Sequence, residues 1–166
     1  MKKQQQKKAL VAGTLVLDII PVFDKGSSAN ERIASGGTIY LDGIQTALGG
    51  VVGNTGLALH RLGADVCLFS RLGDDAFSGL AASLLEQTGC RSVIPAAAGK
   101  NTSSSLIIAP PGGDRMILHS RGASQSYTAE DIPEELLKEN DLLHFGYPTG
   151  MPCMFADGGE TLSAIF

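Results

Sequence analysis

Residues 51–87 decide the fold class, and they read VVGNTGLALHRLGADVCLFSRLGDDAFSGLAASLLEQ. Apolar side chains in residues 51–62, and again in residues 76–87, recur with the spacing of one helical face. Between them, residues 65–71 form a short run rich in β-forming residues, which indicates a buried strand. The order helix, strand, helix is typical of an α/β protein with a parallel sheet.

The flanking segments predict how this sheet is extended. Residues 9–17 are a continuous run of small and apolar residues, typical of a strand buried on both faces, and residues 141–146 repeat the pattern. We expect both to join residues 65–71 in one parallel sheet. Residues 30–47 and 103–121, the latter with a hairpin pattern, are predicted to form a separate small β-sheet. Two further helices are expected, over residues 127–137 and 152–166.

The start of the chain allows two interpretations. Residues 1–8 are rich in lysine and glutamine, which predicts a disordered basic segment. Together with residues 9–17 they also resemble the charged and apolar regions of a signal peptide. Asp18 ends the apolar run and no small-residue cleavage pattern follows, so the buried strand is favoured. No stretch has the length of a transmembrane helix. The three cysteines lack metal-ligand spacing and suit a reducing cytoplasm.

Composition narrows the class of protein. The chain has 166 residues, of which 43% are hydrophobic and 18% charged, as expected for a soluble globular domain. Its net charge is −4, and four of the thirteen basic residues fall within residues 1–8. Residues 9–166 carry nine basic against seventeen acidic side chains, a net charge of −8. A nucleic-acid partner, which needs a basic face, is therefore not expected.

The stretch GGVVGNTG at residues 49–56 is the first candidate binding site. A glycine-rich turn at a helix start lets backbone N–H groups approach a polar ligand. Asn54 can both donate and accept hydrogen bonds, as a sugar hydroxyl requires. A tight packing turn without a ligand explains the stretch equally well. The glycine spacing matches neither a dinucleotide fingerprint nor a P-loop.

Asp18 is the second candidate. It closes the predicted strand of residues 9–17, and ligands of open parallel sheets gather outside the carboxyl ends of the strands. A carboxylate there can accept two hydrogen bonds from a diol, and a turn-forming aspartate is the alternative. The three histidines, His60, His119 and His144, are scattered over the predicted elements and are interpreted as structural.

Several ordered motifs together resemble one family. Gly49-Gly50, Asn54, Gly63 and Gly73-Asp74-Asp75 resemble the first signature of the ribokinase-like, or PfkB, carbohydrate kinases. Residues 13–18 resemble the family's first strand, which ends in an aspartate that binds sugar hydroxyls. The hairpin 103–121 followed by Gly122-Ala123-Ser124 resembles its second lid segment. The resemblance implies a partial three-layer, Rossmann-type α/β sandwich over residues 9–166, with lid segments at about 19–47 and 101–121.

The resemblance also implies a function. It points to an ATP-dependent sugar kinase in which Asp18, Gly49, Gly50 and Asn54 bind the sugar. Tyr147 stands where ribokinase places a ribose-binding glutamate, so a sugar other than ribose is expected.

The family's second signature, Gly-Ala-Gly-Asp, supplies the general base and the anion hole, and it does not occur in this sequence. We therefore expect no catalytic residue here, with ATP and Mg²⁺ bound mainly by a missing C-terminal part. The apolar end at residues 162–166 points the same way. These 166 residues alone are expected to phosphorylate nothing.

Two rival functions remain open. One is a nucleoside kinase of the same superfamily, although the 5% aromatic content offers little for stacking a base. The other is a non-catalytic module that binds a sugar or a partner through the lid. Whatever the function, the small lid sheet has too few residues of its own to cover both of its faces, so we expect a homodimer through the lid. The residues expected at that interface are Ile33, Ile39, Leu41, Leu106, Ile108 and Ile117.

Overall fold

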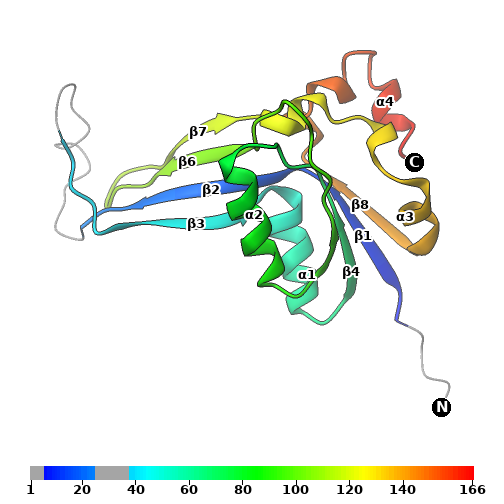
Figure 1. Ribbon diagram of the computed structural model, residues 1–166, viewed down its shortest axis with the longest axis horizontal. Coiled ribbons are helices and arrows are strands. Elements are labelled where there is room, and N and C mark those ends of the chain that lie inside the picture. Colours follow the sequence, from blue (N-terminus) through cyan, green and yellow to red (C-terminus); the bar gives the residue numbers. More distant parts are fainter. Residues whose placement is uncertain (1–5, 25–37) are drawn as a thin grey trace.

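The computed structural model describes residues 6–24 and 38–166, which form two four-stranded sheets (Figure 1). The first sheet is parallel, in the order β5-β4-β1-β8, and its strands are β1 (Lys8–Gly13), β4 (Asp65–Phe69), β5 (Arg91–Val93) and β8 (Leu142–Gly146). The second sheet, called the lid here, has the order β3-β2-β6-β7 and consists of β2 (Leu15–Val22), β3 (Gly43–Gly49), β6 (Ser104–Ile108) and β7 (Met116–Ser120).

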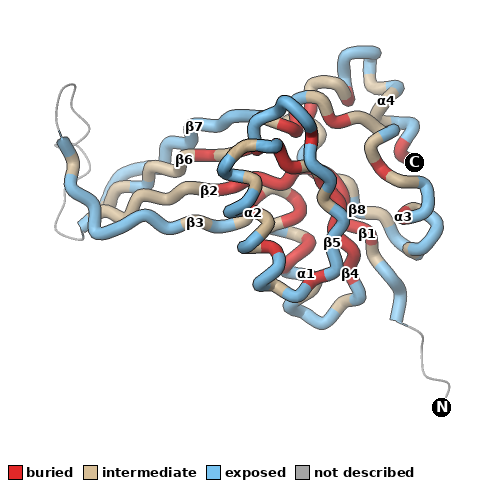
Figure 2. Tube along the Cα trace, in the orientation of Figure 1, coloured by how far each residue is buried: buried red, intermediate tan, exposed pale blue. Residues whose placement is uncertain are grey.

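Helices and turns cover both faces of the parallel sheet. On one face lie a π-helical turn η1 (Val52–Gly56), α1 (Leu57–Arg61) and α2 (Ala76–Glu86). Their apolar side chains pack with Val11 and Leu68. On the other face Leu10 and Phe69 pack under α3 (Glu134–Glu139) and α4 (Glu160–Ser163). Figure 2 shows buried residues in β1, in β4 and at the start of β2, whereas the lid strands extend away from the parallel sheet and are more exposed there. The predicted α/β class is confirmed.

The predicted single strand over residues 9–17 is wrong, because the chain changes sheets within it. β1 ends at Gly13 and β2 begins at Leu15. Gly13 has φ +132°, and a Cβ atom there would lie 2.3 Å from the carbonyl oxygen of Gly146. Only glycine permits this turn so close to β8. Asp18 therefore lies inside β2 of the lid and does not close a strand of the parallel sheet.

The strongly periodic segments follow the prediction. The helix expected over residues 76–87 is α2, and the strands expected over residues 65–71 and 141–146 are β4 and β8. The helix expected over residues 51–62 begins instead as the π-helical turn η1. Gly53 packs tightly there, since a Cβ would lie 2.1 Å from the carbonyl oxygen of Leu48.

The later helices are shorter than predicted. Residues 127–137 contain a 3₁₀ turn, Ala129–Asp131, and α3 begins only after Pro133. Residues 152–166 contain the 3₁₀ turn Pro152–Met154 and α4, which Gly158 and Gly159 separate with positive φ angles. Proline and left-handed glycine both interrupt a continuous helix. Among the described helices, none is long and apolar enough to cross a membrane.

The separate sheet expected from residues 30–47 and 103–121 is present as β3, β6 and β7, with β2 between β3 and β6. Only residues 19–22 of β2 fell within the expected lid segment of about 19–47. β2 pairs antiparallel with β3 and parallel with β6, and β6 and β7 form the predicted hairpin. Residues 30–37, including Ile33, lie outside the described residues, as do residues 1–5 of the expected disordered start. Lys8 of that start already belongs to β1.

Candidate functional site

A cavity of about 460 Å³ lies where the lid meets the parallel sheet. It brings together four of the five predicted site residues, Asp18, Gly50, Asn54 and Tyr147. The lid contributes side chains from β2, β6 and β7, and the other wall comes from the turn after β1, from η1 and from the segment after β8. The remaining lining residues are Thr14, Val16, Ser105, Ile107, Arg115, Ile117, His119, Thr149 and Gly150.

A row of polar residues crosses the lid on the cavity side. Asp18 is paired with Ser105 across β2 and β6, and Ser105 is paired with His119 across β6 and β7. The Ser105 hydroxyl lies 3.0 Å from Nδ1 of His119. Burial raises the pKa of the Asp18 carboxyl above its usual value, while the hydrogen bond with Ser105 and the charge of His119 oppose that rise. We call Asp18, Ser105 and His119 the polar row.

Gly49 and Gly50 make room for this arrangement. A Cβ on Gly49 would lie 2.3 Å from Oδ2 of Asp18, so any side chain there would displace the carboxylate. Gly50 has φ +71°, and its Cβ would lie 2.4 Å from the carbonyl oxygen of Thr14. Close packing within the chain accounts for both glycines. Their contact with a sugar stays a prediction, although Gly50 lines the cavity.

Thr14 occupies the backbone donors at the start of the π-helical turn. The amide of Val51 donates to the Thr14 hydroxyl at 3.3 Å, and the amide of Val52 donates to the carbonyl oxygen of Thr14 at 3.2 Å. A ligand therefore cannot use these two N–H groups without displacing Thr14. The exposed Asn54 lies one turn on, and its side chain has no hydrogen-bond partner among residues 6–24 and 38–166. π-Helical turns occur frequently at functional sites.

Tyr147 has an unusual backbone conformation. With φ +59° and ψ +46°, it is the one non-glycine residue with positive φ in the described part of the chain. It directly follows the carboxyl end of β8, where ligands of parallel sheets gather. Left-handed backbone at a tyrosine costs free energy, and such strain clusters at functional sites. Its side chain is 49% exposed and lines the cavity.

Part of this cavity was not predicted from the sequence. His119 was interpreted as structural, but it lines the cavity together with Arg115 and Ser105. Ile117 and His119 lie on one face of β7, Arg115 directly precedes the strand in the same alternation, and that period of two was visible in the sequence. Which face meets the site follows only from the pairing of β7 with β6.

The Gly73-Asp74-Asp75 motif lies outside the cavity lining and joins α2 to residues 99–102. Asp75 caps α2 by accepting from the amide of Ser78 at 3.2 Å, and it accepts from the amide and hydroxyl of Thr102 at 2.9 and 2.6 Å. Asp74 accepts from the amide of Gly99 at 2.8 Å. This motif anchors the segment that leads into β6.

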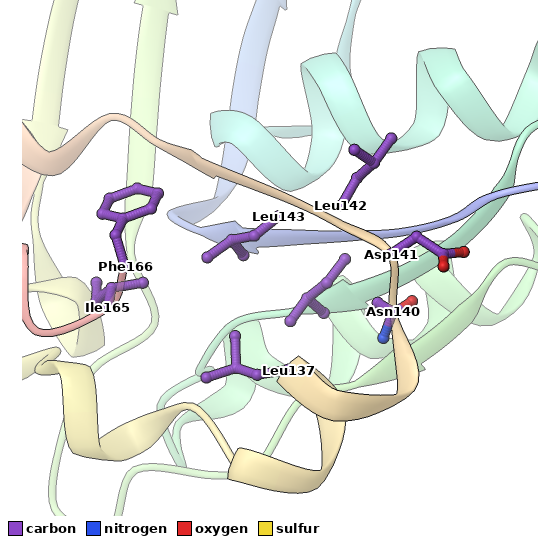
Figure 3. Close-up of a pocket in the computed structure, with 8 residues that line it drawn as sticks. Leu137, Asn140, Asp141, Leu142, Leu143, Ile165 and Phe166 are labelled. Carbon is purple, nitrogen blue, oxygen red and sulfur yellow. The ribbon is translucent and has the colours of Figure 1, made fainter.

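A second cavity, of about 390 Å³, lies beside β8 on the side of α3 and α4. Figure 3 shows Leu137, Leu143, Ile165 and Phe166 around it, with Asp141 at its rim. Asp141 accepts from the amide of Lys8 at 2.8 Å, so its carboxylate is already engaged. Six of its eight lining residues are apolar, and the groove offers no group for chemistry. Within the described ranges, no three His, Cys, Asp or Glu residues are grouped to hold a metal ion.

Two curated relatives are sugar kinases by name. Fructokinase-1 of Zea mays is 26% identical over 137 residues, which covers 81% of this chain and 39% of the relative. Ribokinase of Bacillus subtilis (strain 168) is 29% identical over 118 residues, covering 71% of this chain and 38% of the relative. The chain therefore spans about two-fifths of the length of these relatives.

Solved structures share the fold. Ribokinase from Giardia lamblia superposes with a TM-score of 0.69 at 19% identity, over 84% of this chain and 44% of that one. Ribokinase from Arabidopsis thaliana, complexed with ribose and ATP, gives 0.63 at 20% identity, over 85% of this chain and 45% of that one. The ribokinase-like fold is confirmed. The family description "pfkB family carbohydrate kinase" matches residues 7–156, so this chain belongs to the pfkB family of carbohydrate kinases.

Proposed function

We propose that this 166-residue chain supplies the sugar-binding part and the lid of an ATP-dependent sugar kinase. Such a kinase transfers a phosphoryl group from Mg-ATP to a sugar hydroxyl. The observation that carries the proposal is the polar row, which lines one cavity with Asn54 and Tyr147. Fructokinases and ribokinases among the relatives support a sugar as the acceptor.

The cavity residues suit the recognition of hydroxyl groups. Asp18 is acceptor-only when ionised, and Asn54 offers both donors and an acceptor, so together they can hold a diol in one orientation. Ile107 and Ile117 give the lid an apolar surface that excludes water from the bound sugar. Phosphoryl transfer depends on positioning the acceptor hydroxyl and on stabilising charge, and these residues contribute the positioning.

ATP and Mg²⁺ would bind mainly through residues outside this chain. The resemblance assigns the general base and the anion hole to a Gly-Ala-Gly-Asp segment, which these 166 residues lack. The Arabidopsis relative was solved with ATP, which supports ATP as the phosphoryl donor. Tyr147 in place of the glutamate of ribokinase favours a sugar other than ribose.

Asp18→Asn is expected to weaken sugar binding about 10- to 150-fold, equivalent to about 1.5–3 kcal/mol, because it removes a charged acceptor. Calorimetric titration of the folded protein with a panel of hexoses and pentoses measures the change. Asp65→Asn is the matched control, since Asp65 is exposed at the start of β4 and does not line the cavity. Unchanged binding by Asp18→Asn would make Asp18 a structural residue, and a parent that binds no sugar would overturn the proposed function.

We also propose that the lid forms a homodimer through the face that points away from the cavity. Strand alternation puts Leu106 and Leu118 on that face, because their neighbours Ser105 and His119 line the cavity. Leu118 is 53% exposed, Ile44 is 65% exposed and Met116 is 55% exposed. Ile117, expected at the interface, lines the cavity instead.

Light scattering at high micromolar concentration is expected to give twice the chain mass, and Leu118→Glu is expected to give the monomer. A buried charge without a partner strongly disfavours such an apolar contact. Leu62→Glu changes a leucine that is 83% exposed beyond α1 and is expected to remain dimeric. A parent protein that stays monomeric under these conditions contradicts the proposal.

A further inference from the structure

The residue directly before β7, Arg115, adds a cation to the cavity lining that the hydroxyl-binding role does not use. His119, Ile117 and Arg115 line the cavity in succession. Arg115 precedes His119 by four residues, which is about 13 Å along an extended strand. The cavity therefore has a polar end at the polar row, an apolar middle at Ile107 and Ile117, and a guanidinium at its outer end.

The guanidinium of Arg115 has no carboxylate partner among the described residues. Two other arginines, Arg71 and Arg91, pair with Asp131 at 2.8 Å and with Glu139 at 2.7 Å. The neighbouring carboxylate of Asp114 is engaged differently, because its Oδ1 accepts from the backbone amide of Arg115 at 2.8 Å. The side chain of Arg115 is thus available to a ligand in the cavity.

Guanidinium chemistry identifies the kind of group that fits this end. Its planar fork of N–H donors matches a carboxylate or a phosphate with two parallel hydrogen bonds, whereas a neutral hydroxyl takes only one of them. An anionic group would be repelled by Asp18 at the other end of the cavity and attracted by Arg115. The two charges therefore orient an acidic sugar with its hydroxyls at Asp18 and its anion at Arg115.

We infer that the sugar taken by this cavity carries an oxyanion, a carboxylate or a phosphate, at the end remote from the hydroxyls held at Asp18, and that Arg115 selects it. This inference rests on the proposed sugar-binding function and adds the class of sugar to it. Arg115 is a specificity residue in this account, since it binds the substrate away from the hydroxyls at the polar row.

Calorimetric titrations with fructose, 2-ketogluconate and fructose 6-phosphate test the inference. At low salt, at least one acidic sugar is expected to bind about tenfold or more tightly than fructose, because its bond to arginine is charge-assisted. Arg115→Gln is expected to bring the ratio of acidic-sugar to fructose affinity down to about one, and Arg115→Lys to retain part of the preference. The better of the two acidic sugars shows whether carboxylate or phosphate is the natural group.

Arg121→Gln is the matched control, because it removes the same charge from an exposed residue outside the cavity lining. If Arg121→Gln reduces the preference as much as Arg115→Gln does, the preference comes from the overall electrostatic field of the protein and not from Arg115, and the inference is wrong. If fructose and both acidic sugars bind equally, the inference also fails while the proposed sugar binding stands. If none of the three binds, both fail together.

Discussion

Gly13→Ala is expected to lower the free energy of unfolding by about 3–5 kcal/mol, enough to remove most of the stability of a domain this size. The reason is that the new side chain meets both an unfavourable backbone conformation and a steric clash. The backbone has φ +132°, a region that residues with a side chain avoid, and the new Cβ would lie 2.3 Å from the carbonyl oxygen of Gly146. Neither β1 nor β8 can move away, because the two strands are paired from Ala9 to Gly13. Urea unfolding followed by circular dichroism measures the loss.

Gly99→Ala is the matched control for that substitution. Gly99 also has a positive φ, +67°, but no atom lies within 4 Å of the position that its Cβ would take. The control is expected to cost only the backbone strain, about 1–2 kcal/mol. Equal losses for the two variants would show that the contact with β8 relaxes freely and that the sheet change at Gly13 needs no glycine for steric reasons.

Asp75→Ala is expected to lower the free energy of unfolding by about 2–4 kcal/mol, because one carboxylate holds two elements together. The substitution removes the cap of α2 at Ser78 and both hydrogen bonds from Thr102. The amide of Thr102, which is buried, then loses its partner. The midpoint of urea unfolding is expected to fall, and the start of β6 to exchange its amide hydrogens faster.

The contribution of Asp75 is also expected to depend on pH. Partial burial by itself would raise the pKa of the Asp75 carboxyl, but the hydrogen bonds from Thr102 and Ser78 outweigh it, so the pKa lies below its usual value. A lowered folded-state pKa stabilises the protein fully above the unfolded value of about 3.9, and this contribution is lost as pH falls through the folded value.

The difference in unfolding free energy between the parent and Asp75→Asn is therefore expected to be constant near neutral pH and to shrink below about pH 4. Asp74→Asn is the control, because Asp74 is exposed and accepts a single hydrogen bond, from Gly99. A difference for Asp75→Asn that stays constant down to pH 2 would contradict the role of the ionised carboxylate.

Local periodicity was enough to predict the central elements. The stripe of apolar residues in α2 and the compact β-forming run of β4 are short-range patterns, and α2 was placed to within a residue. Asp75 caps α2, and an aspartate directly before a helix is a capping signal that can be read from the sequence. The family resemblance is confirmed by the match of the pfkB family over residues 7–156.

The binding site was predictable only in outline. Asp18, Asn54 and Tyr147 were named from the sequence and its resemblance, and all three line one cavity. Arg115 and His119 were not, because a β-hairpin with alternating side chains does not reveal which face meets the rest of the protein. The pairing of Ser105 with both Asp18 and His119 decides that question.

Side-chain periodicity over a few residues was enough to predict the α/β class, the strand and helix within residues 65–87, and the hairpin of the lid. Where residues 9–22 divide between the two sheets depends on tertiary packing and could not be predicted from local pattern. Strands of both sheets are buried near Gly13, so the apolar run continues without a break in pattern. The division arises from the approach of β8, which is more than 120 residues distant in the chain and leaves room for no side chain at Gly13.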